Sequence, residues 1–178
     1  LTEELCWNNE VMVHDSDLLK MKYFIKVHRA LSIEEFADFK PELFINCVPL
    51  GLTIEAFDTV LPYLPSQCII SDIASVKTGF REYYENCGHP FVSSHPMFGP
   101  TLANIRDLHE ESAIIISESS KEGADFFRRF YSSLKICIFE YSFEEHDKTV
   151  AYSLATPFAS TMVFAACMKK QDAPGTNF

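Results

Sequence analysis

Short apolar runs alternate with helical segments through most of the chain, and this alternation restricts the fold more than any other feature. The apolar runs are residues 43–48, 68–72, 91–93, 113–117 and 136–141, and the helical segments are residues 53–61, 77–86 and 123–134. Several runs are continuously apolar, which is typical of strands covered on both faces. The pattern predicts an α/β fold in which helices cover both faces of a parallel sheet.

The first 40 residues predict shorter elements. Residues 1–8 indicate the end of a helix that begins upstream, and residues 10–15 indicate a strand that ends at Asp15. A short helical piece is expected over residues 17–25. Ser32 and Glu35 fit a capping box, which predicts a helix that ends near residue 39.

The last part of the chain has a different pattern. Ser142 and Glu145 form a second capping box before a long segment, residues 145–170, whose apolar side chains cover most of a helix circumference. Such a helix would be about 39 Å long, and Pro157 should kink it. We therefore predict one α/β domain over residues 1–143 and the start of a helical domain over residues 144–178, with a homodimer covering the helix.

Composition excludes several classes of protein. The net charge of −10 argues against a nucleic-acid partner. No unbroken run of 18 apolar residues occurs, so we expect no membrane partner. The six cysteines include no C-x-x-C pair, which favours a reducing, cytoplasmic location without disulfides or a zinc site. The histidines show no metal-ligand spacing, so we predict no metal.

Candidate binding residues follow the predicted strands. In open parallel sheets, ligands bind at the carboxyl ends of the strands. Asp15, the pair Val48 and Pro49, the turn 72–75 and His95 all lie at predicted strand ends. They should therefore share one edge of the sheet.

His95 lies in a stretch that cannot form a helix. Residues 93–101 read SSHPMFGPT, and their two prolines restrict the backbone on both sides. The stretch predicts a rigid loop that presents His95 for acid–base chemistry. The simpler interpretation is that the imidazole of His95 only bonds a nearby carbonyl group.

Two other polar residues each have two interpretations. Asp15 could bind the adenosine ribose of a dinucleotide, which would favour NAD over NADP, or could cap the next helix. Ser75 could orient His95 or bind substrate, or could be an N-cap. Lys77 fits a surface charge, and the remaining histidines, His146 included, fit structural roles.

A glycine fingerprint for phosphate binding is missing from the visible chain. The motif belongs at the first strand-to-helix turn, so about 15–20 residues of a standard dinucleotide-binding unit are unaccounted for. Either these residues precede Leu1, or the protein does without them. We expect the chain to be a fragment of a longer protein.

The motifs together resemble the prephenate dehydrogenase family of tyrosine biosynthesis. The resemblance lies in DIASVK at residues 72–77, SHPMFGPT at residues 94–101 and EHD at residues 145–147, which match in order and spacing over nearly the whole chain. It implies an NAD-binding Rossmann-type domain without its first strand, followed by the first helix of an all-α dimerisation domain. It also implies oxidative decarboxylation of prephenate to 4-hydroxyphenylpyruvate, or of arogenate to tyrosine.

The resemblance also implies residue roles. His95 would accept the proton of the ring hydroxyl while hydride passes to NAD, and Ser75 would be its hydrogen-bonding partner. Asp15, Val48, Pro49 and Ala74 would contact the cofactor, whereas Ser75, His95 and Thr101 would contact the substrate.

The chain departs from the family where some members carry further histidines, at Ala155 and Phe158. The substrate therefore stays open between prephenate and arogenate. The family's carboxylate-binding arginine would lie beyond Phe178. Two other hypotheses remain: a Rossmann dehydrogenase of another small hydroxy acid, and a non-catalytic module that dimerises or senses a metabolite.

Overall fold

The computed structural model describes residues 2–99 and 107–171. Its centre is a five-stranded sheet in the order β3-β4-β5-β6-β7. The strands are β3 (Leu43–Asn46), β4 (Ile69–Asp72), β5 (Phe91–Pro96), β6 (Ser112–Ile116) and β7 (Cys137–Tyr141). A separate parallel pair is formed by β1 (Met12–Val13) and β2 (His28–Arg29).

The sheet is mixed, whereas the sequence pattern predicted an all-parallel one. Strands β3, β4 and β5 are parallel, but β6 runs antiparallel to β5, and β7 is parallel to β6. Parallel neighbours need a crossover connection, usually a helix, and no helix was predicted between β5 and β6. The carboxyl ends of β3, β4 and β5 therefore lie at one edge of the sheet, and those of β6 and β7 lie at the opposite edge.

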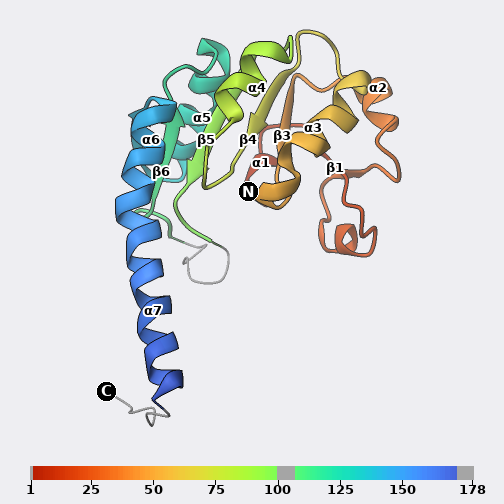
Figure 1. Ribbon diagram of the computed structural model, residues 1–178. Coiled ribbons are helices and arrows are strands. Elements are labelled where there is room, and N and C mark those ends of the chain that lie inside the picture. Colours follow the sequence, from red (N-terminus) through yellow and green to blue (C-terminus); the bar gives the residue numbers. More distant parts are fainter. Residues whose placement is uncertain (1, 100–106, 172–178) are drawn as a thin grey trace.

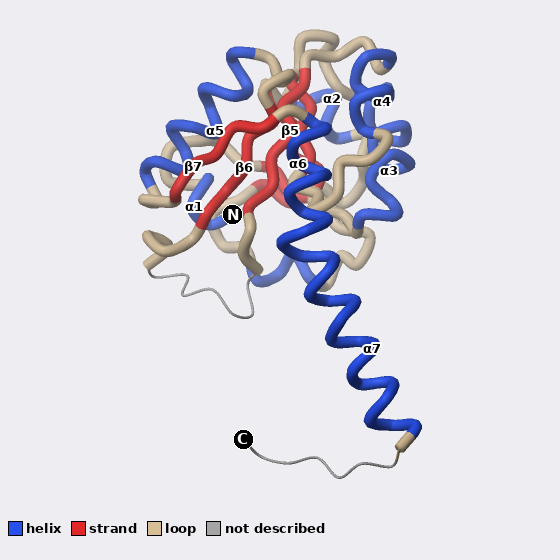
Figure 2. Tube along the Cα trace, turned by 60° about the vertical axis from the view of Figure 1, so that its left-hand side comes forward, coloured by secondary structure: helices blue, strands red, loops and turns tan. Residues whose placement is uncertain are grey.

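Helices cover both faces of the sheet, as predicted (Figure 1, Figure 2). One face packs against α2 (Glu35–Phe39), α3 (Thr53–Val60), α4 (Phe80–Asn86) and the start of α6 (Phe143–Val150), and the other packs against α5 (Lys121–Ser133). Within β6, Ile114 and Ile116 join the first core and Ala113 and Ile115 the second. A strand buried on both faces explains the continuous apolar run in the sequence.

Several elements are shorter or longer than predicted. The first helix, α1 (Thr2–Leu5), is short, and residues 20–23 form a single 3₁₀ turn. The helix predicted from residue 77 begins at Phe80, after Gly79 adopts a left-handed φ of 84°. Strand β5 continues through His95 because residues 94–96 pair with β6, so His95 lies in a strand and not in a loop.

The long C-terminal helix is continuous from Phe143 to Lys170. It consists of α6, a π-helical turn (Ala151–Ala155) and α7 (Thr156–Lys170). The predicted capping box is present, since Ser142 accepts from the N–H of Glu145 and the Glu145 side chain accepts in return. The wide turn lies directly before Pro157, which has no N–H and crowds the preceding turn of a helix.

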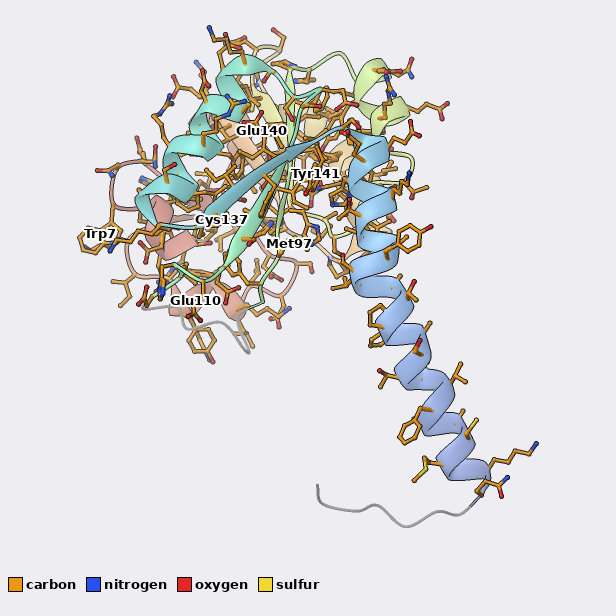
Figure 3. All side chains as sticks on the ribbon, turned by 90° about the vertical axis from the view of Figure 1, so that its left-hand side faces the viewer. Trp7, Met97, Glu110, Cys137, Glu140 and Tyr141 are labelled. Carbon is orange, nitrogen blue, oxygen red and sulfur yellow. The ribbon has the colours of Figure 1, made fainter. Side chains whose placement is uncertain are left out.

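Helix α7 extends away from the rest of the structure (Figure 3). Its large apolar side chains are exposed, among them Phe158, Met162 and Phe164, each at 60% or more. By length and composition alone, the helix from Phe143 to Lys170 could cross a membrane. The described residues leave this helix uncovered, and the prediction that a homodimer covers it stays a prediction.

Candidate active site

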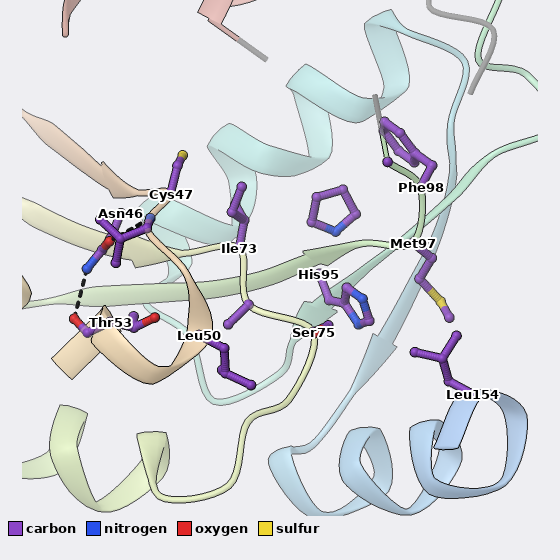
Figure 4. A pocket seen from close by; sticks show the side chains of 14 residues that line it. Asn46, Cys47, Leu50, Thr53, Ile73, Ser75, His95, Met97, Phe98 and Leu154 are labelled. Atoms are coloured by element: carbon purple, nitrogen blue, oxygen red, sulfur yellow. Dashed lines mark hydrogen bonds between the residues drawn. The ribbon is translucent and has the colours of Figure 1, made fainter. Parts of the chain in front are cut away.

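A cleft of about 430 Å³ opens at the carboxyl ends of β3, β4 and β5. Its walls come from the segments that follow these strands and from the long helix (Figure 4). The residues that line it are Asn46, Cys47, Val48, Leu50, Thr53, Ile73, Ala74, Ser75, His95, Pro96, Met97, Phe98, Gly99 and Leu154. The edge predicted from the sequence therefore carries a cleft.

Val48, Ala74, Ser75 and His95 meet in this cleft, as predicted from their strand ends. Pro49 lies in the same wall by sequence, between two lining residues, although it does not line the cleft. Thr101 lies outside the described residues.

Asp15 is not among the residues that line the cleft. It follows β1 by two residues, where its Oδ1 accepts from the N–H of Asp17 at 2.8 Å and lies 3.8 Å from Lys20 Nζ. This bond closes a local turn and does not cap a helix, because the next helical turn (Lys20–Tyr23) has Leu19 at its N-cap and no side-chain cap. Its predicted contact with the cofactor stays a prediction.

His95 is buried, with 5% of its surface exposed, and contacts a second histidine. Its Nδ1 lies 3.0 Å from Nε2 of His146, which belongs to α6 and is completely buried. Within residues 2–99 and 107–171, neither Ser75 nor a backbone carbonyl group bonds this nitrogen. His146, which was expected to have only a structural role, is therefore the hydrogen-bonding partner of His95. The sequence predicted Ser75 as that partner, and Ser75 does not bond Nδ1 of His95.

Asp147 holds the far side of His146. Its Oδ1 lies 3.0 Å from His146 Nδ1 and also accepts from the backbone N–H of Lys77 at 2.9 Å. Its Oδ2 accepts from the hydroxyl of Thr78 at 2.8 Å. Burial would raise the pKa of Asp147, but the hydrogen bonds from Thr78, His146 and Lys77 outweigh it and hold the pKa below its usual value.

Lys77 is buried, which corrects the expectation of a surface charge. Its Nζ forms an ion pair with Asp72 Oδ1 and donates to the carbonyl oxygen of Ser94 at 2.7 Å. Burial lowers the pKa of Lys77, and the Asp72 carboxylate opposes that shift. A lysine is almost never fully buried without such a pair.

Asp72 fixes the turn after β4. Its carboxylate accepts from the backbone N–H of Ala74 at 2.9 Å and from the hydroxyl of Tyr84 at 2.7 Å, in addition to Lys77. On the neighbouring strand end, Asn46 accepts from the N–H of Val48 and donates to the carbonyl oxygen of Thr53. Both turns are therefore held in place by buried side chains.

The surroundings keep His95 neutral. Burial lowers its pKa to about 4, and the positive charge of Lys77 and the neighbouring His146 act in the same direction. Burial also lowers the pKa of His146. A neutral imidazole at the wall of a cleft can act as a general base.

The sequence matches one family over most of its length. The family model described as "Prephenate dehydrogenase, nucleotide-binding domain" matches residues 15–137. A curated protein of Methanocaldococcus jannaschii, named "Probable arogenate/prephenate dehydrogenase", is 27% identical over 100 residues, which are 54% of this chain and 22% of that protein.

Solved structures show the same fold. The prephenate dehydrogenase of A. aeolicus in complex with hydroxyphenyl propionate and NAD+ matches with a TM-score of 0.81 and 18% identity, over 94% of this chain and 64% of that one. The arogenate dehydrogenase of Synechocystis matches with a TM-score of 0.75 and 18% identity, over 93% and 63%. The helix from Phe143 to Lys170 has more residues than the 6–7% of this chain that the two structures leave unmatched. Part of this helix therefore has a counterpart in each of the two structures.

The chain spans less than two thirds of the length of each of these relatives. At these identities the structures establish the fold, and the family model establishes the family because it matches more than half of the chain. This chain belongs to the prephenate dehydrogenase family, and its residues 15–137 match that family's nucleotide-binding domain.

Proposed function

We propose that the full-length protein catalyses NAD-dependent oxidative decarboxylation of prephenate, giving 4-hydroxyphenylpyruvate and carbon dioxide. The observation that carries this proposal is the buried, neutral His95 at the wall of the cleft. Arogenate, which carries an amino group where prephenate has a keto group, is the alternative substrate of the same reaction. Relatives named for each substrate support both.

The cleft fits the nicotinamide half of NAD. Val48 and Ala74 give it apolar walls, and the turns that carry them are fixed by Asn46 and Asp72. The Thr53 hydroxyl oxygen is buried beside the cleft without a hydrogen-bond partner among residues 2–99 and 107–171, which leaves one polar group available. When bound, NAD supplies the hydride acceptor. Asp15 is proposed to hold the adenosine ribose, which favours NAD over NADP.

His95 is proposed to remove the proton of the substrate's ring hydroxyl. As the C–H bond at that carbon breaks, its electron pair leaves as hydride and the carbon becomes a ketone. The ring carboxylate opposite then leaves as carbon dioxide, and the electrons of the broken C–C bond complete the aromatic ring and convert the ketone to a phenolate, which takes back the proton held by His95. Ser75, in the same cleft, is proposed to bind the substrate hydroxyl.

The second domain is proposed to cover α7. The long helix presents large apolar side chains on several sides, and the sheet cannot bury them because α7 extends beyond it (Figure 1). Relatives of this chain are longer. We propose that further helices of the full-length protein and a second copy of it pack on α7 in a homodimer.

The test is NADH formation by the full-length protein, followed by absorbance, with prephenate and arogenate supplied separately. We expect turnover with one or both and a loss of at least about 100-fold in kcat for His95→Ala, because general base catalysis contributes about 10²–10⁴-fold. His28→Gln is the matched control, since His28 is an exposed histidine outside the cleft. It should keep wild-type turnover.

Other outcomes assign other functions. Turnover of a different small hydroxy acid that still needs His95 would identify another Rossmann dehydrogenase. A folded full-length protein that binds NAD but oxidises none of these substrates would favour the non-catalytic module.

A further inference from the structure

We propose that His146 and Asp147 form a positioning relay that sets the tautomer of His95, so that its Nε2 carries the lone pair needed by a general base. The inference rests on the proposed function and deepens it. It assigns roles to two residues of α6 that lie outside the cleft lining.

The relay begins at Asp147, which can only accept hydrogen bonds. Three donors converge on its carboxylate: the N–H of Lys77, the hydroxyl of Thr78 and Nδ1 of His146. An ionised carboxylate carries no proton to share. The hydrogen between His146 and Asp147 therefore belongs to Nδ1 of His146.

The protonation state of His146 then determines that of His95. A neutral imidazole with its proton on Nδ1 has a lone pair on Nε2. His146 Nε2 faces Nδ1 of His95 at 3.0 Å, a hydrogen-bond distance that requires one proton between the two nitrogens. His95 must donate that proton from Nδ1, so its Nε2 is left unprotonated.

The opposite arrangement is disfavoured by the surroundings. If His146 were protonated on both nitrogens, it could donate to His95 Nδ1, and a neutral His95 would then have its proton on Nε2. His146 is completely buried, and burial together with the positive charge of Lys77 lowers its pKa despite the opposite effect of the Asp147 and Asp72 carboxylates. A doubly protonated His146 would thus be a buried cation beside another one.

The relay also joins two parts of the chain. Asp147 binds the turn after β4 through Lys77 and Thr78, and His146 binds the end of β5 through His95. The start of α6 thus contacts two of the segments that build the cleft, the turn after β4 and the end of β5. Serine proteases use the same logic, in which a buried aspartate fixes the tautomer of the catalytic histidine.

The direct test is ¹⁵N NMR of the full-length protein labelled in histidine, with the His95 signals assigned by their loss in His95→Ala. We expect neutral His95 to be protonated on Nδ1 and unprotonated on Nε2. A proton on Nε2, or an equal mixture of tautomers, would overturn the relay. The tautomer is read from the unsubstituted protein, and His95→Ala serves only to assign its signals.

Kinetics provide the second test. His146→Leu removes the acceptor and should lower kcat by about 100-fold, the low end of general base effects, with little change in the KM for NAD. His146→Gln places a carbonyl oxygen near the position of Nε2 and should restore part of the loss. Equal losses in both variants, or kcat within twofold of wild type in His146→Leu, would overturn the proposal.

Failure of the relay and failure of the proposed function give different results. If His95→Ala is inactive while His146→Leu retains wild-type kcat, only the relay is wrong. If His95→Ala itself retains wild-type turnover, the role of His95 is wrong, and the relay fails with it.

Discussion

His95 and His146 are 51 residues apart in the sequence, yet their imidazole nitrogens lie 3.0 Å apart in the structure. One belongs to the central sheet and the other to the helix that leads out of the α/β domain. The contact makes the environment of His95 depend on both elements. Changes in the sheet, in the helix or in the packing between them should therefore be measurable in stability or activity.

The pH dependence of the reaction should report the lowered pKa of His95. The base must be neutral, and its pKa is lowered from 6.5 to about 4. Activity should therefore persist as the pH falls through 6.5 and decline only nearer to pH 4. The measurement is kcat/KM for the substrate against pH. An acidic limb with an apparent pKa of 6.5 or higher would contradict the assignment of His95 as a buried base.

Replacing Lys77 should destabilise the domain strongly. Lys77→Met leaves the buried Asp72 carboxylate without its ion-pair partner, which costs about 3–5 kcal/mol in comparable buried pairs. Urea unfolding of the full-length protein measures the loss. Lys121→Met, at an exposed lysine in α5, is the control and should change stability by about 0.5 kcal/mol or less.

The Lys77 prediction has an internal check. Adding Asp72→Asn to Lys77→Met removes the unpaired charge and should recover part of the loss. No recovery would show that the lysine stabilises the fold by packing and not by charge.

Gly123 should not tolerate a side chain although it lies in a helix. A Cβ atom at this position would lie 2.7 Å from Cβ of Val92, because α5 packs closely on β5 there. Gly123→Ala should therefore destabilise the protein by about 1–3 kcal/mol. This loss exceeds the stabilisation that alanine gives a helix relative to glycine. Gly51→Ala is the matched control, because a Cβ atom at Gly51 would meet nothing within 4 Å among the described residues beyond its chain neighbours. Unchanged thermal unfolding of Gly123→Ala would show that the helix can move away from the strand.

Asp15→Ala should raise the use of NADP relative to NAD. A carboxylate at the end of this strand bonds the ribose hydroxyls and repels a 2′-phosphate. The ratio of kcat/KM for the two cofactors is the measurement. Asp17→Ala, two residues further along, should leave that ratio unchanged, and an unchanged ratio in Asp15→Ala would restrict Asp15 to the turn it closes.

The sequence predicted the features that depend on local pattern. Continuous apolar runs identified β3, β4 and β6, and S-x-x-E identified the start of α6. The convergence of Val48, Ala74 and His95 followed from strand ends, because parallel neighbours carry their carboxyl ends to one edge.

Features that depend on long-range contacts were missed. Lys77 looks like a surface charge until Asp72 and Ser94 are placed around it. His146 carries no local sign of its contact with His95, which arises only when α6 packs beside β5. The antiparallel direction of β6 could have been inferred from the sequence, because no helical segment was predicted between residues 96 and 112 and a parallel crossover usually contains one.

The π-helical turn at Ala151–Ala155 affects the rotational phase of the long helix. Each residue of an α-helix advances the side chains by about 100°, and a π turn accommodates one residue more than an α turn. In an uninterrupted α-helix one additional residue would rotate every later side chain by about 100°, whereas the π turn takes up that residue within a single wider turn. The side chains of α7 therefore keep nearly the phase that α6 sets, where His146 contacts His95.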